Sequence, residues 1–156
     1  SKGFPNLTDN DWLHGGTHDK IKETITNGRQ GVMPPMAAAV GTSEDVRNVA
    51  NYALSLSGSP HNSIAAQLGK PKFAACAACH GADGKGNQAV GAPNLTDGIW
   101  LFGSSEASII EGITKGRNVN VSEGTLAMPT FKETLGPEKI HLVAAYVWGL
   151  SNKPAK

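Results

Sequence analysis

The chain has 156 residues, a formal net charge of +1 and only two cysteines. This length fits one domain or two small ones, and without a basic run nothing points to nucleic acid or to an anionic membrane surface as a partner. No stretch approaches eighteen consecutive apolar residues, so we expect no transmembrane helix and no signal peptide in this chain, although either could have been removed upstream.

The first third of the chain predicts helices joined by loops. Thr42 is a suitable N-cap, because Asp45 follows three residues later and an apolar helical face comes after it. That face consists of residues at helical spacing: Val46, Val49, Ala50 and Ala53. The polar stretch 59–63 then predicts a linker between a first module, residues 1–58, and a second module, residues 64–156.

The second module opens with a short turn that Ser63 can cap, and Pro71 suits the first position of the helix that follows. No alternation with a period of two stands out, so we expect no strands. Residues 81–103 contain many glycines, which predicts an irregular loop.

Two more helices are expected toward the C-terminus. Ser104 or Ser105 begins a helix with isoleucines on one face, and Gly116 ends it. A loop over residues 118–135 precedes the last helix, which opens at Pro137. The chain is therefore predicted to be all-α.

The sequence Cys76-Ala77-Ala78-Cys79-His80 is the attachment signature of haem c. The two-residue gap places both sulfurs on one side of a helical turn, where each can form a thioether with one vinyl group of the porphyrin. His80 then lies under the iron as its proximal ligand. A thioredoxin-like redox pair would need a βαβ context, and a zinc site would need more ligands.

The chain repeats itself. In the first half of the repeat, Pro5-Asn6-Leu7-Thr8-Asp9 corresponds to Pro93-Asn94-Leu95-Thr96-Asp97. Further identical pairs follow in the same order: Trp12 and Trp100, Ile21 and Ile109, Ile25 and Ile113, Gly28 and Gly116, Arg29 and Arg117, Met33 and Met128, Val49 and Val143, Ala50 and Ala144, Tyr52 and Tyr146. We interpret this as a tandem duplication.

The register of the repeat makes the first module incomplete. Ser1 aligns with Ala89, so the first module's own Cys-x-x-Cys-His motif would precede residue 1. We expect one covalent haem c in this chain and a second in the full-length parent protein. Two explanations stay open: the first motif was removed from the protein, or the protein contains it and only this chain lacks it.

The second iron ligand is predicted to be Met128. It lies in a polar loop downstream of His80, and Pro129 holds the preceding residue in an extended conformation. A thioether ligand favours ferrous iron, which suits an electron carrier. The alternative is a methionine that only fills core space. In the first module Met33 is the equivalent residue and Met36 its competitor, and either could bind a first haem if the missing segment exists.

These motifs together resemble the soluble part of the dihaem cytochrome c subunit (subunit III, CcoP) of cbb(3)-type, C-family haem–copper cytochrome c oxidases. The Pro-Asn-Leu-Thr-Asp…Trp-Leu string, present twice, carries most of the resemblance, which spans almost the whole chain. The family's first haem motif and membrane anchor are absent here, and residues 118–126 lengthen the second Met loop.

The resemblance implies tandem class I cytochrome c modules, the first truncated before its haem-attachment motif. It implies that the chain is an electron-transfer subunit and no enzyme by itself. Electrons would pass from a soluble cytochrome c donor to the oxygen-reducing catalytic subunits in the membrane. The location would be periplasmic, with the parent protein anchored in the bacterial inner membrane by an upstream segment.

Three more residues are candidates for contact with the haem. In class I cytochromes a proline at the place of Pro93 offers its carbonyl to the proximal histidine, although Pro93 could also be a turn proline. Arg117 could neutralise a haem propionate or be a solvated arginine. Trp100 could stack near the porphyrin edge or pack in an ordinary core.

Other functions remain open at this point. A free-standing soluble dihaem carrier would lack the oxidase partner, and a haem enzyme or gas-binding module would have an open iron site. The remaining histidines are expected on the surface, each a conceivable iron ligand: His14, His18, His61 and His141.

Overall fold

The computed structural model describes residues 3–119 and 127–152, and helices supply the regular structure in these ranges. In chain order the elements are α1 (His18–Asn27), α2 (Ala37–Val40), α3 (Ser43–Leu56), α4 (Ser63–Gly69), the 3₁₀ turn η1 (Pro71–Phe73), α5 (Ala74–His80), α6 (Glu106–Lys115) and α7 (Lys132–Ser151). Within the described ranges the only strand-like pairing is three isolated β-bridges. The prediction of an all-α chain is confirmed.

The expected helix ends are mostly present. Thr42 and Asp45 cap α3 reciprocally, each side chain bonding the other's backbone N–H. Ser105 caps α6, and Gly116 ends it with a φ of 75°, which favours glycine. The expectation that Ser63 caps the next helix is wrong, because the Asn62 side chain accepts the free N–H groups there.

The last helix begins earlier than predicted. Residues 132–135 already form a helical turn, where the sequence predicts a loop. Gly136, at φ 71° and ψ 169°, then breaks the helix, and Pro137 opens the regular part as expected. Of the longer second Met loop, residues 120–126 lie outside the described residues.

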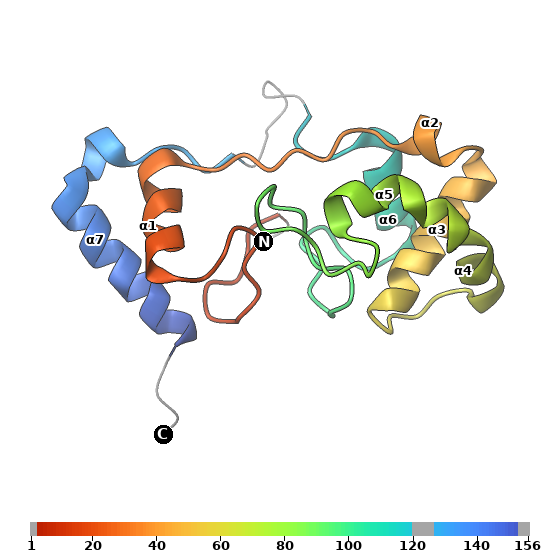
Figure 1. The fold of residues 1–156 in the computed structure, drawn as a ribbon, viewed down its shortest axis with the longest axis horizontal. Coiled ribbons are helices and arrows are strands. Elements are labelled where there is room, and N and C mark those ends of the chain that lie inside the picture. The colour runs from red at the N-terminus through yellow and green to blue at the C-terminus, as the bar shows by residue number, and fades with distance from the viewer. Residues whose placement is uncertain (1–2, 120–126, 153–156) are drawn as a thin grey trace.

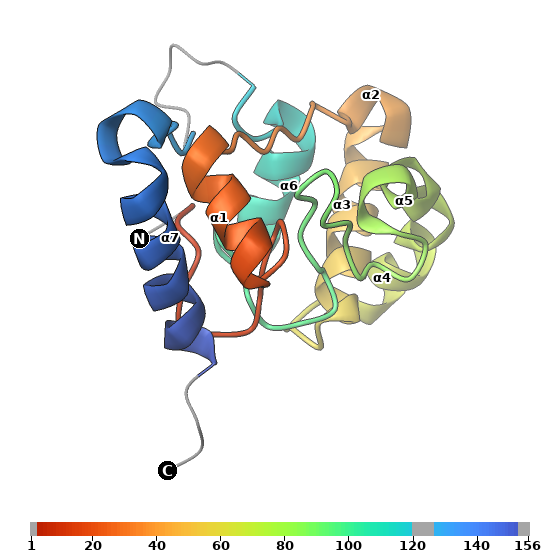
Figure 2. The same ribbon diagram turned by 60° about the vertical axis from the view of Figure 1, so that its left-hand side comes forward.

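The helices form two groups, one at each end of the molecule in Figure 1. On one side α3 packs against α4, η1 and α6, with Cys76 and Ile113 in the shared core. On the other side α1 packs against α7 through Ile21, Ile25 and Ile140. Figure 2 shows the same pairing of α1 with α7 from another direction.

The crossing between the groups consists of two extended segments that run antiparallel, side by side (Figure 1): residues 28–36, and residues 117–119 with 127–131. Arg29 pairs with Met128 through both backbone hydrogen bonds, 3.0 and 2.8 Å. Met33 pairs with Arg117 in the same way, 3.0 and 2.8 Å. Because Arg29 corresponds to Arg117 and Met33 to Met128 in the repeat, the crossing has an approximate two-fold symmetry.

The packing groups therefore combine helices from both copies of the repeat. α3 lies before residue 59 but covers helices of residues 63–115, and α7 covers α1 near the N-terminus. The division into residues 1–58, linker 59–63 and residues 64–156 describes the repeat in the sequence and stays a prediction for the folded chain. Over the described ranges, no helix has the length and apolar character needed to cross a membrane.

Candidate haem-binding site

The two cysteines and His80 are all carried by the short helix α5. Cys76 is buried in the core with Phe73 and Val49, whereas Cys79 is exposed. Burial, with the neighbouring Cys79, raises the pKa of the Cys76 thiol. Neither cysteine forms a disulfide, so both sulfurs are available for thioether formation.

His80 is buried and held by the glycine-rich loop that follows it. Its Nδ1 lies 3.0 Å from the carbonyl oxygen of Pro93, which accepts the ring N–H when the proton is on that nitrogen. Gly86 donates its backbone N–H to the His80 carbonyl at 2.8 Å. This arrangement leaves Nε2 of His80 as the nitrogen for a metal.

A cavity of about 790 Å³ lies between the two helical groups, and its lining is mostly apolar. Cys76, Cys79 and His80 line one side of it. Its volume is in the usual range for small-molecule and cofactor pockets, about 300–1,000 Å³. Trp100 also lines the cavity, and its buried Nε1 has no hydrogen-bond partner in the described part of the chain.

These residues fit a covalently attached haem. The cavity supplies a largely apolar envelope, and the unpartnered Trp100 N–H is a donor for a polar group at its wall. Among the described residues no group of three His, Cys, Asp or Glu side chains could hold a bare metal ion. A zinc site, which usually has four such ligands, therefore does not fit α5.

Arg117 lines the same cavity and is fixed by its neighbours. Its Nη2 donates to the Ser108 carbonyl at 2.8 Å, and its guanidinium lies 4.8 Å from the centre of the Phe102 ring. Nη1 is 3.5 Å from the carboxylate of Glu111. Arg117 is therefore an ordered charge beside the cavity and differs from the solvated arginine considered above.

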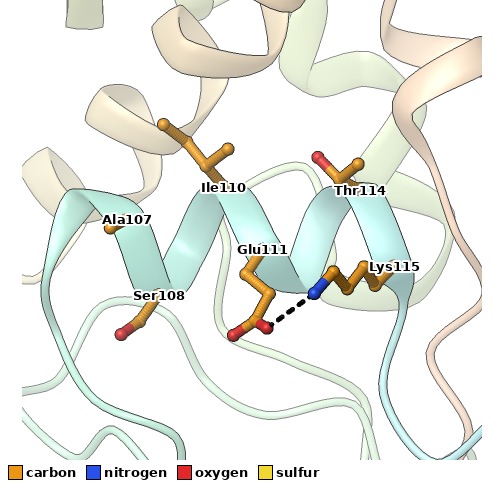
Figure 3. Close-up of a pocket in the computed structure, with 6 residues that line it drawn as sticks. All are labelled: Ala107, Ser108, Ile110, Glu111, Thr114 and Lys115. Carbon is orange, nitrogen blue, oxygen red and sulfur yellow. Dashed lines mark hydrogen bonds and ion pairs between the residues drawn. The ribbon is translucent and has the colours of Figure 1, made fainter.

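Glu111 connects this arginine to the outer face of α6. It also accepts a hydrogen bond from Lys115, 3.2 Å away, as Figure 3 shows. The hydrogen bond and charge of Lys115, followed by the charge of Arg117, hold the pKa of Glu111 below its usual range. The surface of α6 thus keeps a carboxylate beside Arg117.

The three methionines occupy different places. Met33 and Met36 are half-buried and pack against the core cluster that contains Cys76. Met128 is 37% exposed and pairs with Arg29, next to the α1–α7 group. All three line the cavity. The prediction that Met128 binds the iron above His80 is not tested by these positions.

His14 is the functional candidate that sequence reasoning placed wrongly on the surface. It is half-buried, lines the cavity and touches Gly91 in the loop after the haem motif. Burial, and next the charge of Arg29, lower its pKa. The repeat contains the missing signal, because His14 corresponds to Phe102, which also lines the cavity.

The other histidines lie away from the cavity lining. His18 and His141 meet edge to face with ring centres 4.9 Å apart, at the contact of α1 with α7. His61 is exposed, with Nδ1 2.7 Å from the Ser59 carbonyl oxygen.

Comparison with known proteins gives one matching family. The profile of "Cytochrome C oxidase, cbb3-type, subunit III" matches residues 1–52 and 67–147. The match includes the haem motif, the cavity-lining loop and the crossing segments, which is more than half of the chain.

Curated relatives carry matching names. "Cbb3-type cytochrome c oxidase subunit CcoP" of Rubrivivax gelatinosus is 67% identical over 151 residues, which are 97% of this chain and 47% of the relative. The FixP subunit of Azorhizobium caulinodans is 45% identical, over 94% of this chain and 51% of the relative. The CcoP subunit of Cereibacter sphaeroides is 40% identical, over 95% and 52%. The chain spans about half the length of these relatives.

Proposed function

This chain belongs to the family of subunit III of cbb3-type cytochrome c oxidases, and from that membership we propose that it transfers electrons through one covalently bound haem c. Bound haem supplies an iron that takes up and releases a single electron. The chain itself performs no substrate chemistry in this proposal. The observation that carries it is the Cys-x-x-Cys-His motif on α5, with His80 held by Pro93 at the wall of a large apolar cavity.

Different residues of the cavity would hold different parts of the haem. Cys76 and Cys79 fix it through thioethers, and His80 presents Nε2 because Nδ1 bonds Pro93. The same bond makes the imidazole a stronger donor, which stabilises ferric iron. Arg117 and the Trp100 N–H are the proposed partners of the propionates, because both residues line the cavity and this N–H has no partner in the described part of the chain.

The relay belongs to the whole protein, of which this chain is about half by comparison with its relatives. We propose that a soluble cytochrome c donor reduces it and that the oxygen-reducing subunit of the oxidase accepts the electron. The site would be in the periplasm, with the parent protein anchored in the inner membrane. A second haem would be bound by the first copy of the repeat in the parent chain.

The sixth ligand is proposed to be Met33, which differs from the sequence prediction of Met128. Met33 packs on the cluster that contains Cys76, and its backbone is paired with Arg117, at the end of α6. Met128 is paired with Arg29, at the end of α1, and packs outside that cluster. The crossing of the two Met-Pro segments thus favours an exchange of methionines between the copies, with Met128 left for the second haem.

Attachment is tested by mass spectrometry and optical spectroscopy of the purified chain matured in a cytochrome c–producing host. One covalent haem and the spectrum of a low-spin haem with saturated vinyl positions are expected. The Cys76→Ala/Cys79→Ala chain is the control, from which haem should be extractable. Colourless wild-type protein, or haem that is extractable from it, would contradict the proposal.

The sixth ligand is tested by Met33→Ala, Met36→Ala and Met128→Ala. The sulfur-to-iron charge-transfer band and carbon monoxide binding by the reduced protein are the readouts. Met33→Ala should lose the band and bind carbon monoxide, while the other two variants keep the wild-type spectrum. Loss in Met128→Ala alone would restore the sequence prediction, and carbon monoxide binding by the wild type would favour an open-site haem protein.

A further inference from the structure

Helix α7 exposes apolar side chains to solvent on a face that is covered in α3, its counterpart in the repeat. Leu142 is 68% exposed and Tyr146 is 70% exposed, and the neighbouring Val143 is exposed as well. Helix α3 carries the corresponding residues Asn48, Val49 and Tyr52, of which Asn48 is 6% exposed and Val49 1% exposed. The same helical face is thus covered in one copy of the repeat and open in the other.

The first shared contact is with the helix that follows the glycine-rich loop. In one group Val46 and Ala50 of α3 pack in a cluster with Ile113 of α6. In the other group Ile140 and Ala144 of α7 pack in a cluster with Ile25 of α1. These residues correspond pair by pair in the repeat, so α3 on α6 and α7 on α1 are equivalent packings.

The second contact is made in one group only. The segment from Asn62 to Phe73 covers the outer face of α3: Tyr52 meets the Phe73 ring edge to face, with ring centres 5.2 Å apart. The Asn62 backbone N–H donates to the Asn51 side chain at 2.7 Å. Gly69 lies against the Asn48 backbone so closely that a Cβ at Gly69 would clash with the Asn48 carbonyl oxygen. No described helix makes the corresponding contact with α7.

We propose that this α7 face, formed by Leu142, Val143 and Tyr146, is the docking surface for a helical segment of the parent chain that precedes residue 1. The occupant is the repeat counterpart of residues 62–80, the segment that covers α3. Two observations on chain length support it: the register places that counterpart before Ser1, and the curated relatives are about twice as long as this chain. The inference goes beyond electron transfer and does not depend on which methionine binds the iron.

The occupant should resemble its counterpart chemically. It should be a short helix with an aromatic side chain that meets Tyr146 as Phe73 meets Tyr52, and with a small residue at the closest approach to the α7 backbone. Burial of the exposed Leu142, Val143 and Tyr146 side chains then supplies the driving force for docking. Because α7 belongs to the second copy of the repeat, this contact would join the two ends of the parent protein's haem-binding part.

The test is thiol labelling of the full-length parent subunit, isolated from its oxidase partners. Leu142→Cys and Tyr146→Cys are compared with Glu138→Cys as the matched control on the same helix. Glu138 corresponds to Glu44, which stays exposed although α3 is covered. A maleimide should label the cysteines at 142 and 146 at least tenfold more slowly than the one at 138, independently of protein concentration.

Three results would overturn the proposal. Equal labelling at all three positions would leave the face open. Protection that requires a high protein concentration would assign the face to a second copy, and protection only in the assembled oxidase would assign it to another subunit.

Hydroxyl-radical footprinting of the unsubstituted subunit repeats the test without a variant: Tyr146 should oxidise as slowly as Tyr52. The optical spectrum measured in parallel reports on the haem, so failure here is distinguishable from failure of the proposed function.

Discussion

Replacement of Asn51 by alanine tests whether α3 stabilises the group of helices that contains the haem motif. Asn51 is fully buried on α3 and connects three elements. Its Oδ1 accepts the Asn62 N–H at 2.7 Å at the start of α4, and its Nδ2 donates to Glu106 of α6 at 2.7 Å. Nδ2 also reaches the Arg47 carbonyl at 3.0 Å. Alanine would remove all three bonds at once.

The expected loss of stability is about 3 kcal/mol. Each hydrogen bond contributes about 1 kcal/mol net, and the partly buried Asn62 N–H left without its partner costs a further amount of similar size. Glu106 contributes less than a buried charge would, because its side chain is 36% exposed and water can replace the amide. The loss should be seen as a fall of about 1–3 M in the urea midpoint.

Asn48→Ala is the matched control one turn earlier on the same helix. Asn48 is also buried, but its Oδ1 has no partner in the described part of the chain, so its removal should cost under about 1 kcal/mol. Both variants are unfolded in urea as haem-loaded protein and followed by circular dichroism. Equal losses in the two variants, or a loss under about 1 kcal/mol in Asn51→Ala, would refute the role given to α3.

The pH dependence adds a second check on the same residue. The Asn51 amide, with the charge of Arg47, holds the pKa of Glu106 below its usual range. A carboxylate with a lowered pKa in the folded state contributes stability above its unfolded pKa, and this contribution is lost as the pH falls through the folded pKa. The difference in the free energy of unfolding between wild type and Asn51→Ala should therefore become smaller as the pH is lowered.

Two further predictions concern the haem side and the surface of α6. Gly86→Ala should raise the reduction potential, because the new Cβ would press on the backbone at Pro93 and weaken the hydrogen bond between Pro93 and His80. That hydrogen bond favours ferric iron, so its loss favours ferrous iron. Potentiometric titration is the measurement, and an unchanged potential would contradict the prediction. Lys115→Met should raise the pKa of Glu111 toward its usual range, because Lys115 is the largest cause of its lowering; a carboxyl NMR titration checks this, and an unmoved pKa would show that Arg117 dominates.

Local structure was largely predictable because single residues determine it. The reciprocal cap of Thr42 and Asp45, and Gly116 at the end of α6, follow from hydrogen-bonding capacity and allowed φ values. Ser63 was misjudged as a cap because Asn62, one residue earlier, has an equally suitable side chain. The helical turn before Gly136 is too short for any periodicity to indicate it.

The pairing of helices was not predictable from the repeat, and the reason is physical. α3 and α7 carry similar apolar residues at the equivalent positions that contact a partner helix: Val46 and Ile140, Ala50 and Ala144. Either helix can therefore cover α6 or α1, and pattern alone does not distinguish the two choices. Buried polar contacts are specific to one copy, since Asn51 corresponds to Ala145. Such residues specify the partner helix.

The pairing of residues 28–36 with residues 117–119 and 127–131 limits how the chain can be divided. α3 needs η1 and α6 to bury Val49, and the motif helix α5 needs α3 to bury Cys76. A fragment that began at residue 64 would keep the haem motif but expose the core on which Cys76 packs. We therefore infer that the boundary between the two copies of the repeat is no boundary of folding stability. Because each group of helices contains both copies, disruption of one Met-Pro segment should weaken both groups together.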